Sequence, residues 1–304
     1  MEEEMKEEGQ QTAELAETAK VSEREGNSLV LQSEPQETAV FPSYQKVLRA
    51  RSKDRPGIRT YIGGLFTDFV ELHGDRLYRD DPSLIGGIGL FHGTPVTVIG
   101  QVKGKTTTEQ IACNFGMTSP EGYRKARRLM EQAEKFHRPV ITLIDTPGAY
   151  PGKEAEENGQ SAAIAESIAY MSRMSVPSIA VITGEGSSGG ALALALADRV
   201  YMLEDAVYAI LSPEGFASIL WKDAGRAPEA SEVMKLTARE LLERGLIDGI
   251  VPEYAGYETD PAPLIRRLDE ALTASLRELT RMNPKALVRA RYQRYRRIDG
   301  LYGR

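Results

Sequence analysis

The stretch from Val181 to Leu203 reads VITGEGSSGGALALALADRVYML and contains three successive local patterns. The β-branched run that ends at Thr183 predicts a buried strand, and the glycine-rich GEGSSGG that follows predicts a tight turn. The alternating alanines and leucines after it predict a short helix of small residues. This order aims several backbone N–H groups at one point, where the helix N-terminus adds partial positive charge. The stretch therefore suits an oxyanion that forms during a reaction, or else it only allows close packing of helix on sheet.

Ser188 offers a competing interpretation of the same turn. Residues 186–190 satisfy the G-x-S-x-G pattern that presents a nucleophilic serine in α/β-hydrolases. That arrangement needs a histidine after the serine, but all the histidines of this chain precede it, namely His73, His92 and His137. A serine–lysine dyad with Lys222 or Lys235 stays open in principle. The sequence therefore favours the glycine backbone over the serine hydroxyl as the working part of the turn.

A second stretch, LIDTPGAYPG at residues 143–152, is again a buried strand that ends in a glycine and proline turn before a helix. Parallel α/β folds keep their ligands at such strand ends. Two turns with free backbone N–H groups can supply the two donors of one oxyanion hole. Asp145 is interpreted as a residue that caps its own turn rather than as a general base, because Asp-Thr-Pro is ordinary turn chemistry.

The rest of the chain alternates strand and helix patterns. Short β-branched runs predict buried strands at Pro95–Val102, Arg138–Asp145, Val176–Thr183, Arg199–Leu203 and Ala206–Leu211. Apolar spacing or capping signals predict helices at Arg59–Leu72, Ser119–His137 and Glu154–Met174, and again from Thr237 onward apart from a connection at Gly249–Pro261. Such alternation predicts an α/β fold in which helices cover mostly parallel strands.

Composition indicates a protein of the cytoplasm. The 304 residues carry a net charge of -6, and no apolar run approaches the roughly 20 residues that span a bilayer. Residues 1–40 hold 11 Glu against three basic residues, are poor in aromatics and have no secretory signal. They are expected to be an acidic extension, disordered or at most a frayed helix, of a domain at 41–304. The single cysteine, Cys113, excludes an internal disulfide and a cysteine-rich zinc site, so no metal is expected in this chain.

Two basic segments are candidates for binding an anionic ligand or partner. GQVKGKTT at 100–107 has only three residues between its glycines, so a tight turn that presents Lys103 and Lys105 is favoured over a phosphate loop. Residues 281–304 hold eight Lys or Arg against Asp299. They form either a solvated helix face or a patch for an acidic partner or a coenzyme A phosphate. Nucleic-acid binding is not expected, because no basic stripe with stacking aromatics accompanies them.

Five segments together resemble one protein family, the carboxyltransferase α subunit of bacterial acetyl-CoA carboxylase. They are FVELHGDRLYRDDPSLIGGIG, NFGMTSPEGYRKARRLM, LIDTPGAYPG, GEGSSGGALALALADRVYMLE and SPEGFASILWKD. They occur in the order of the family and extend the resemblance from about residue 43 to about residue 253. The N-terminal region departs from the regular helical segment that is usual in the family.

The resemblance implies a fold, a reaction and partners. The fold would be a crotonase-type superhelix of ββα units with flanking helices. The chain would act in an α2β2 enzyme that moves a carboxyl group from carboxybiotin to acetyl-CoA, giving malonyl-CoA for fatty acid biosynthesis. Carboxybiotin would be presented by the biotin carboxyl carrier protein, with biotin carboxylase in the wider complex. No cofactor would be bound covalently in this chain, and zinc would belong to the β subunit.

The resemblance also assigns roles to residues. Gly148, Ala149, Gly189 and Gly190 match the oxyanion-hole positions of the family, and we expect their backbone N–H groups to hold the ureido oxygen of carboxybiotin as negative charge develops. Weaker candidates for steering anionic substrates are Arg124, Lys125, Lys103 and Lys105. Two other interpretations stay open: a self-sufficient crotonase-like acyl-CoA enzyme, and a non-catalytic scaffold for a catalytic β chain.

Overall fold

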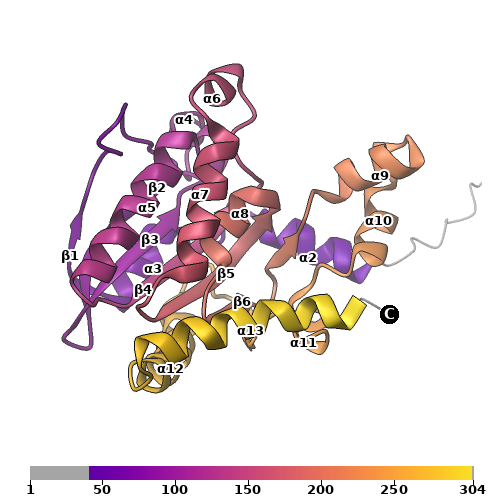
Figure 1. The fold of residues 1–304 in the computed structure, drawn as a ribbon. Coiled ribbons are helices and arrows are strands. Elements are labelled where there is room, and N and C mark those ends of the chain that lie inside the picture. The colour runs from indigo at the N-terminus through magenta and orange to yellow at the C-terminus, as the bar shows by residue number, and fades with distance from the viewer. Residues whose placement is uncertain (1–40, 303–304) are drawn as a thin grey trace, which may run out of the picture. The chain divides into compact units, whose positions relative to one another are not determined.

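A mixed β-sheet with the strand order β1-β2-β3-β4-β5-β6-β8 forms the centre of the fold, and β7 pairs with β5 (Figure 1). The computed structural model describes residues 41–302, and the side chains of residues 41–298. The strands are β1 Thr67–Glu71, β2 Leu84–Phe91, β3 Thr94–Gln101, β4 Val140–Thr146, β5 Ser178–Ser187, β6 Arg199–Leu203, β7 Val207–Ala209 and β8 Gly249–Val251. β1, β2 and β3 pair antiparallel, and every pairing from β3 onward is parallel.

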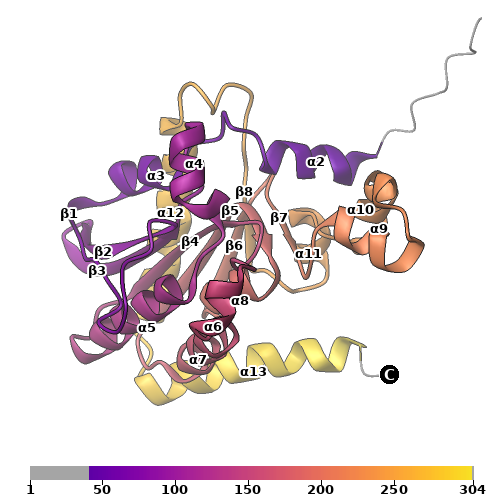
Figure 2. The ribbon, with the colours of Figure 1, turned by 90° about the horizontal axis from the view of Figure 1, so that it is seen from above.

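Helices cover both faces of this sheet. α5, α7 and α8 lie on one face and α3 and α12 on the other, while α9 and α10 pack beside α2 (Figure 2). The helices are α2 Pro42–Ala50, α3 Ile58–Leu65, α4 Thr107–Ala112, α5 Pro120–Lys135, α6 Lys153–Glu157, α7 Gln160–Arg173, α8 Ser188–Ala195, α9 Pro213–Trp221, α10 Ala227–Met234, α11 Ala238–Glu243, α12 Ala262–Leu279 and α13 Pro284–Tyr302. Short 3₁₀ turns occupy Asn114–Gly116 and Ala224–Arg226. The predicted α/β class is confirmed.

Three predicted elements differ from the structure. The helix expected at Arg59–Leu72 ends at Leu65, because the chain turns extended at Phe66 and then pairs as β1 with β2. Gly87 of β2 permits this pairing, since a Cβ there would lie 2.1 Å from the carbonyl oxygen of Val70. The helix expected at Glu154–Met174 breaks at Gly159, whose φ is +81°. The expected connection at Gly249–Pro261 begins with strand β8.

The acidic extension predicted at residues 1–40 lies outside the described residues. Within residues 41–302, no helix combines the length and the apolar composition that crossing a bilayer requires.

A buried ion pair fastens α13 to the sheet. The side chains of Arg291 and Asp198 are 0% and 3% exposed, and their closest charged atoms lie 2.7 Å apart. Arg291 also donates to the carbonyl oxygens of Met171, Met174 and Val176, which follow one another at the end of α7 and before β5. Because every polar atom of the guanidinium is used, its burial is compensated.

Replacing Arg291 with methionine should destabilise the fold strongly. The change leaves the Asp198 carboxylate buried without its cation, and breaking such a pair costs about 3–5 kcal/mol. Chemical unfolding of the purified chain measures this loss. The control is Arg289→Met, because Arg289 is exposed on the same helix and should change stability by less than about 0.5 kcal/mol. Equal stability of the two variants would contradict the structural role of the pair.

Candidate active site

The two turns singled out in the sequence lie side by side. β4 and β5 are neighbouring parallel strands, and Thr146 at the end of β4 pairs with Gly186 near the end of β5. β4 leads into the turn at Pro147–Tyr150, and β5 leads directly into α8. The carboxyl ends of adjacent parallel strands share one edge of the sheet, so both turns open at the same place.

The turns touch at Gly190. A Cβ built on Gly190 would lie 2.5 Å from the amide nitrogen of Ala149 and 2.7 Å from the carbonyl carbon of Gly148. No side chain fits in that space, so glycine is required for the two backbones to approach. Gly189 is less constrained, because its Cβ would meet only Ile164 at 3.5 Å. The structure therefore brings together the four residues to which the sequence assigned the oxyanion hole.

The N-terminus of α8 is left without a side-chain cap. Its N-cap residue, Ser187, makes no capping hydrogen bond, whereas Thr106 and Ser212 cap α4 and α9 in the usual way. The first N–H groups of a helix have no partners within the helix. Ser188 sits in the left-handed region with φ +58°, which costs about 1–2 kcal/mol for a residue other than glycine. The amides of Gly189 and Gly190 thus begin a helix whose donors are not capped by the preceding serine.

The second turn offers one amide rather than two. Gly148, with φ +144°, donates its N–H to the hydroxyl oxygen of Thr146 at 3.1 Å. Ala149 forms a parallel bridge with Thr118, but the N–H that donates to the Thr118 carbonyl, at 3.0 Å, is that of Tyr150. This leaves the N–H of Ala149 out of that hydrogen bond. Ala149, Gly189 and Gly190 are therefore better placed as donors than Gly148.

Buried polar side chains hold the turns from behind. The carbonyl of Gly190 accepts hydrogen bonds from Gln101 Nε2 and Tyr123 Oη, each at 3.2 Å. Gln160 Nε2 donates to the carbonyl of Thr118 at 2.8 Å. All three side chains are buried. Their role could not be predicted from the sequence, because each side chain binds a backbone atom that is far away along the chain.

Lys103 forms ion pairs with carboxylates near the ends of both β4 and β5. Its Nζ lies 2.7 Å from Asp145 Oδ1 and 2.8 Å from Glu185 Oε2, and Asp145 also accepts the backbone N–H of Glu185 at 3.0 Å. The role assigned to Asp145 is thus wrong, because its carboxylate crosses to the neighbouring strand. Thr146 caps the turn instead. Asp145 ends one predicted strand and Glu185 lies in the turn predicted after the next strand, and this shared position at neighbouring strand ends is the signal that could have paired them.

Electrostatics favour the charged forms of Lys103 and Glu185. Burial alone would lower the pKa of Lys103, but the carboxylates of Asp145 and Glu185 raise it above its usual value. Burial alone would raise the pKa of Glu185, but Lys103 and Arg51 lower it. Arg51 Nε lies 2.7 Å from Glu185 Oε1, and the same guanidinium reaches Glu214 at the start of α9. Each of the three carboxylates, Asp145, Glu185 and Glu214, contacts Lys103 or Arg51, which indicates a structural cluster rather than a general base.

The other basic candidates divide into buried and exposed residues. Lys125 is 1% exposed, and its Nζ lies 2.5 Å from Asp80 Oδ1. Arg124 bonds Asp75 at 2.8 Å and the carbonyl of Asn158 at 2.9 Å. These two cations serve the fold, so their placement does not favour a role in steering substrate. Lys105 is exposed.

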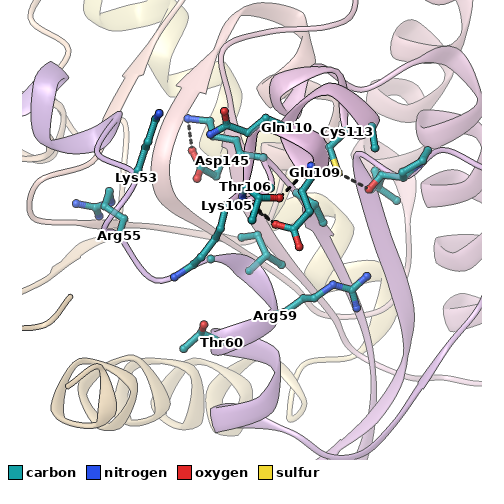
Figure 3. Close-up of a pocket in the computed structure, with 18 of the residues that line it drawn as sticks. Lys53, Arg55, Arg59, Thr60, Lys105, Thr106, Glu109, Gln110, Cys113 and Asp145 are labelled. Carbon is teal, nitrogen blue, oxygen red and sulfur yellow. Dashed lines mark hydrogen bonds and ion pairs between the residues drawn. The ribbon is translucent and has the colours of Figure 1, made fainter. Parts of the chain in front are cut away.

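Lys103 and Lys105 line a cavity of about 680 Å3 on the side of the site next to α3. Figure 3 shows Lys53, Arg59 and Lys105 around it, with Asp145 at its inner end. The guanidinium of Arg55, which also lines the cavity, is occupied by the carbonyl of Thr183 and by Glu253. Acidic side chains share the lining, so the cavity has mixed charge: Glu71, Asp80, Asp81, Glu109 and Asp145.

A second cavity, of about 580 Å3, opens directly beside the start of α8. Ser188 and Gly189 belong to its wall, together with largely apolar side chains from β7, α8, α10, α11 and α13. These are Leu192, Tyr208, Ile210, Met234, Leu241, Tyr295 and Ile298. An apolar pocket with a few backbone donors at one end is typical of a small-molecule site.

Solved structures that share this fold include a transcarboxylase, a subunit of an acyl-CoA carboxylase and a decarboxylase assembly. Transcarboxylase 12S aligns with a TM-score of 0.61 and 21% identity over 76% of this chain and 44% of that one. The β subunit of P. aeruginosa geranyl-CoA carboxylase gives 0.59 and 17% over 81% of this chain and 46% of that one. The chain thus spans less than half of either. A Pseudomonas malonate decarboxylase hetero-tetramer gives 0.57 and 18% identity, over 66% and 81%. The expected crotonase-type fold of carboxyltransferases is confirmed.

Sequence comparison specifies the family within this class. A sequence model of the family described as acetyl co-enzyme A carboxylase carboxyltransferase-like matches residues 2–299. The acetyl-coenzyme A carboxylase carboxyl transferase subunit alpha of Carboxydothermus hydrogenoformans is 56% identical over 84% of this chain and 79% of its own. The Clostridium botulinum subunit of the same name is 51% identical over 86% and 96%. The chain belongs to the family of acetyl-coenzyme A carboxylase carboxyltransferase α subunits.

Replacing Lys103 with methionine should destabilise the fold by about 3 kcal/mol at neutral pH, because Asp145 and Glu185 lose the cation that they share. This loss of folding stability should be smaller at acidic pH. The lowered pKa of Glu185 stabilises the native chain above its ordinary value of about 4.5, and this contribution falls as the pH drops. In the variant Glu185 has lost one of the two cations that lower its pKa, so less of this contribution is present to be lost.

Urea unfolding at about pH 7.5 and about pH 4, on either side of the ordinary pKa of a glutamate, measures how the stability difference between wild type and variant decreases. Lys105→Met is the matched control, because Lys105 is exposed and should change stability by less than about 0.5 kcal/mol. A difference between wild type and Lys103→Met that does not depend on pH would argue against the shared cation.

Proposed function

We propose that this chain is the α half of a carboxyltransferase that moves a carboxyl group from carboxybiotin to acetyl-CoA, giving malonyl-CoA for fatty acid biosynthesis. Membership in the α-subunit family supports the reaction and the acyl-CoA acceptor. The observation that carries the proposal is the contact of Gly190 with the Gly148–Ala149 peptide, which gathers backbone donors from two strand ends.

The chain would act through these donors. The N–H groups of Ala149, Gly189 and Gly190 would hold an oxygen atom that gains negative charge during transfer, and the N-terminus of α8 would add partial positive charge. Such donors contribute most when they are fixed before the reaction begins. The hydrogen bonds of Gln101 and Tyr123 to the Gly190 carbonyl support that fixation. No general base from this chain is needed in this scheme.

The apolar cavity beside α8 fits the biotin group. A fused ring with an apolar sulfur side and a polar ureido side matches a mostly apolar wall that also contains Lys235, Arg244 and the backbone of Ser188 and Gly189. When bound there, carboxybiotin supplies the carboxyl group that is transferred. The residues of the cavity would orient the ring and exclude water, and the glycine amides would face its polar side.

Partners complete the proposed enzyme. The name of the family implies a β subunit, and we propose an α2β2 assembly in which β supplies most of the acetyl-CoA site and a zinc ion. Biotin would arrive on the biotin carboxyl carrier protein, with biotin carboxylase in the wider complex. Residues 41–298 contain no cluster of three or more potential metal ligands. A steering role for Lys105 toward anionic substrates, and a cytoplasmic location, stay predictions.

Substituting Gly190 with alanine should lower carboxyl transfer by about 100-fold or more in the reconstituted αβ complex. The added Cβ would displace the Ala149 amide, which it would otherwise approach to 2.5 Å. Malonyl-CoA decarboxylation with biocytin as the acceptor measures the rate, and co-purification with the β subunit shows that assembly is intact. Near-normal rates would refute the proposed oxyanion hole and favour a scaffold role.

Ser188→Ala tests the serine-nucleophile interpretation in the same assay. The substitution removes the hydroxyl but keeps every backbone N–H group, so we expect a rate within about twofold of wild type. A loss comparable to that of Gly190→Ala would instead assign chemistry to the hydroxyl.

A further inference from the structure

The basic C-terminal segment has a specific place in the fold. A groove of about 780 Å3 runs between α7 and α13, and its wall contains five basic side chains and no carboxylate. The five are Arg173, Lys285, Arg289, Arg291 and Arg296. Its apolar lining includes Leu196 and Val288, and Tyr292 is 62% exposed at its side. The groove is therefore both apolar and positively charged.

Only some of the cations on α13 are used by the fold. Arg291 is buried against Asp198, and Arg294 pairs with Asp248 at 2.5 Å. Lys285 and Arg289 are exposed, and neither makes an ion pair with any residue that the structure describes. They lie four residues apart and therefore on one face of the helix. Two positive charges on this face are thus available to a partner.

The groove and the proposed biotin cavity are neighbours that share one wall residue, Tyr295. Its hydroxyl donates to the carbonyl oxygens of Ala195 and Ala197 at 3.2 Å each, which fixes the ring at the end of α8. From Arg289 to Tyr295 the helix advances only about 9 Å. A protein seated on the groove would stand beside the mouth of the cavity that ends at Gly189.

We propose that this groove is the docking surface for an acidic face of the protein domain that carries biotin. The inference rests on the proposed function, because it names the partner that brings the substrate to that site. A substrate tethered to a protein needs a surface for its carrier next to the pocket. Complementary charge at such a surface accelerates encounter and makes it sensitive to salt, while the pocket itself supplies the chemistry.

The test compares tethered with free biotin in the reconstituted αβ complex. Lys285→Glu/Arg289→Glu should raise the KM for the biotinylated carrier protein about tenfold, because it reverses the charges that attract the carrier. With free biocytin as acceptor, the rate and KM of malonyl-CoA decarboxylation should stay within about twofold of wild type. Added salt should raise the KM for the carrier in the wild type and much less in the variant.

Arg266→Glu/Arg277→Glu is the matched control. It makes the same change of net charge at two exposed positions of α12, which covers the other face of the sheet, and should leave both KM values unchanged. Three results would overturn the inference: an unchanged KM for the carrier, an equal loss with biocytin, or loss of co-purification with the β subunit, which would make the groove a subunit interface. Failure of the proposed function itself would appear separately, as a wild-type complex that is inactive with biocytin.

Discussion

The shared ion pair of Lys103 with Asp145 and Glu185 is the constraint on which the candidate site depends. Two parallel strands end here, β4 in an irregular turn and β5 directly in the helix α8. Strand pairing fixes their register up to Thr146 and Gly186, but it does not fix the backbone beyond that point. The cation bridges the two strands immediately before the turns begin. The backbone amides further along can therefore be held at one spot without side chains of their own.

Close backbone approach complements this ionic bridge. Gly190 lets α8 contact the neighbouring turn, and buried donors on β3 and α5 hold its carbonyl. The polar interactions behind the turns are buried, whereas the amides in front belong to half-buried residues, Ala149 and Gly189. Preorganised electrostatic catalysis requires this arrangement, in which buried hydrogen bonds fix the backbone and its N–H groups can still donate to a ligand.

Much of this architecture could be predicted from the sequence, for reasons that particular residues make clear. β3, β4 and β5 were recognisable because runs such as VITLID are apolar, β-branched and bounded by proline and glycine. The two turns were recognisable because glycine-rich stretches follow those strands. The segment that became β1 was not, since the spacing of Phe66, Phe69 and Val70 also fits a helix, and only pairing with β2 decides the matter.

The site itself was predicted less completely. Gly148, Ala149, Gly189 and Gly190 were identified, and they meet in space. The ion pairs that position them were missed, because Lys103 and Glu185 are 82 residues apart and nothing local distinguishes a structural lysine from one that binds substrate. Lys125 shows the same difficulty. It was a candidate for steering anionic substrates, yet the fold buries it against Asp80.

The uncapped start of α8 also has a thermodynamic consequence. A capping side chain at a helix N-terminus stabilises a protein by about 1 kcal/mol, and this helix forgoes that contribution at Ser187. A capping hydrogen bond from a side chain at this position would make the free chain more stable, but that side chain would compete with the bound anion that we propose. Without such a cap the helix start is less stable, and binding of a ligand to these N–H groups should restore part of the folding stability by linkage.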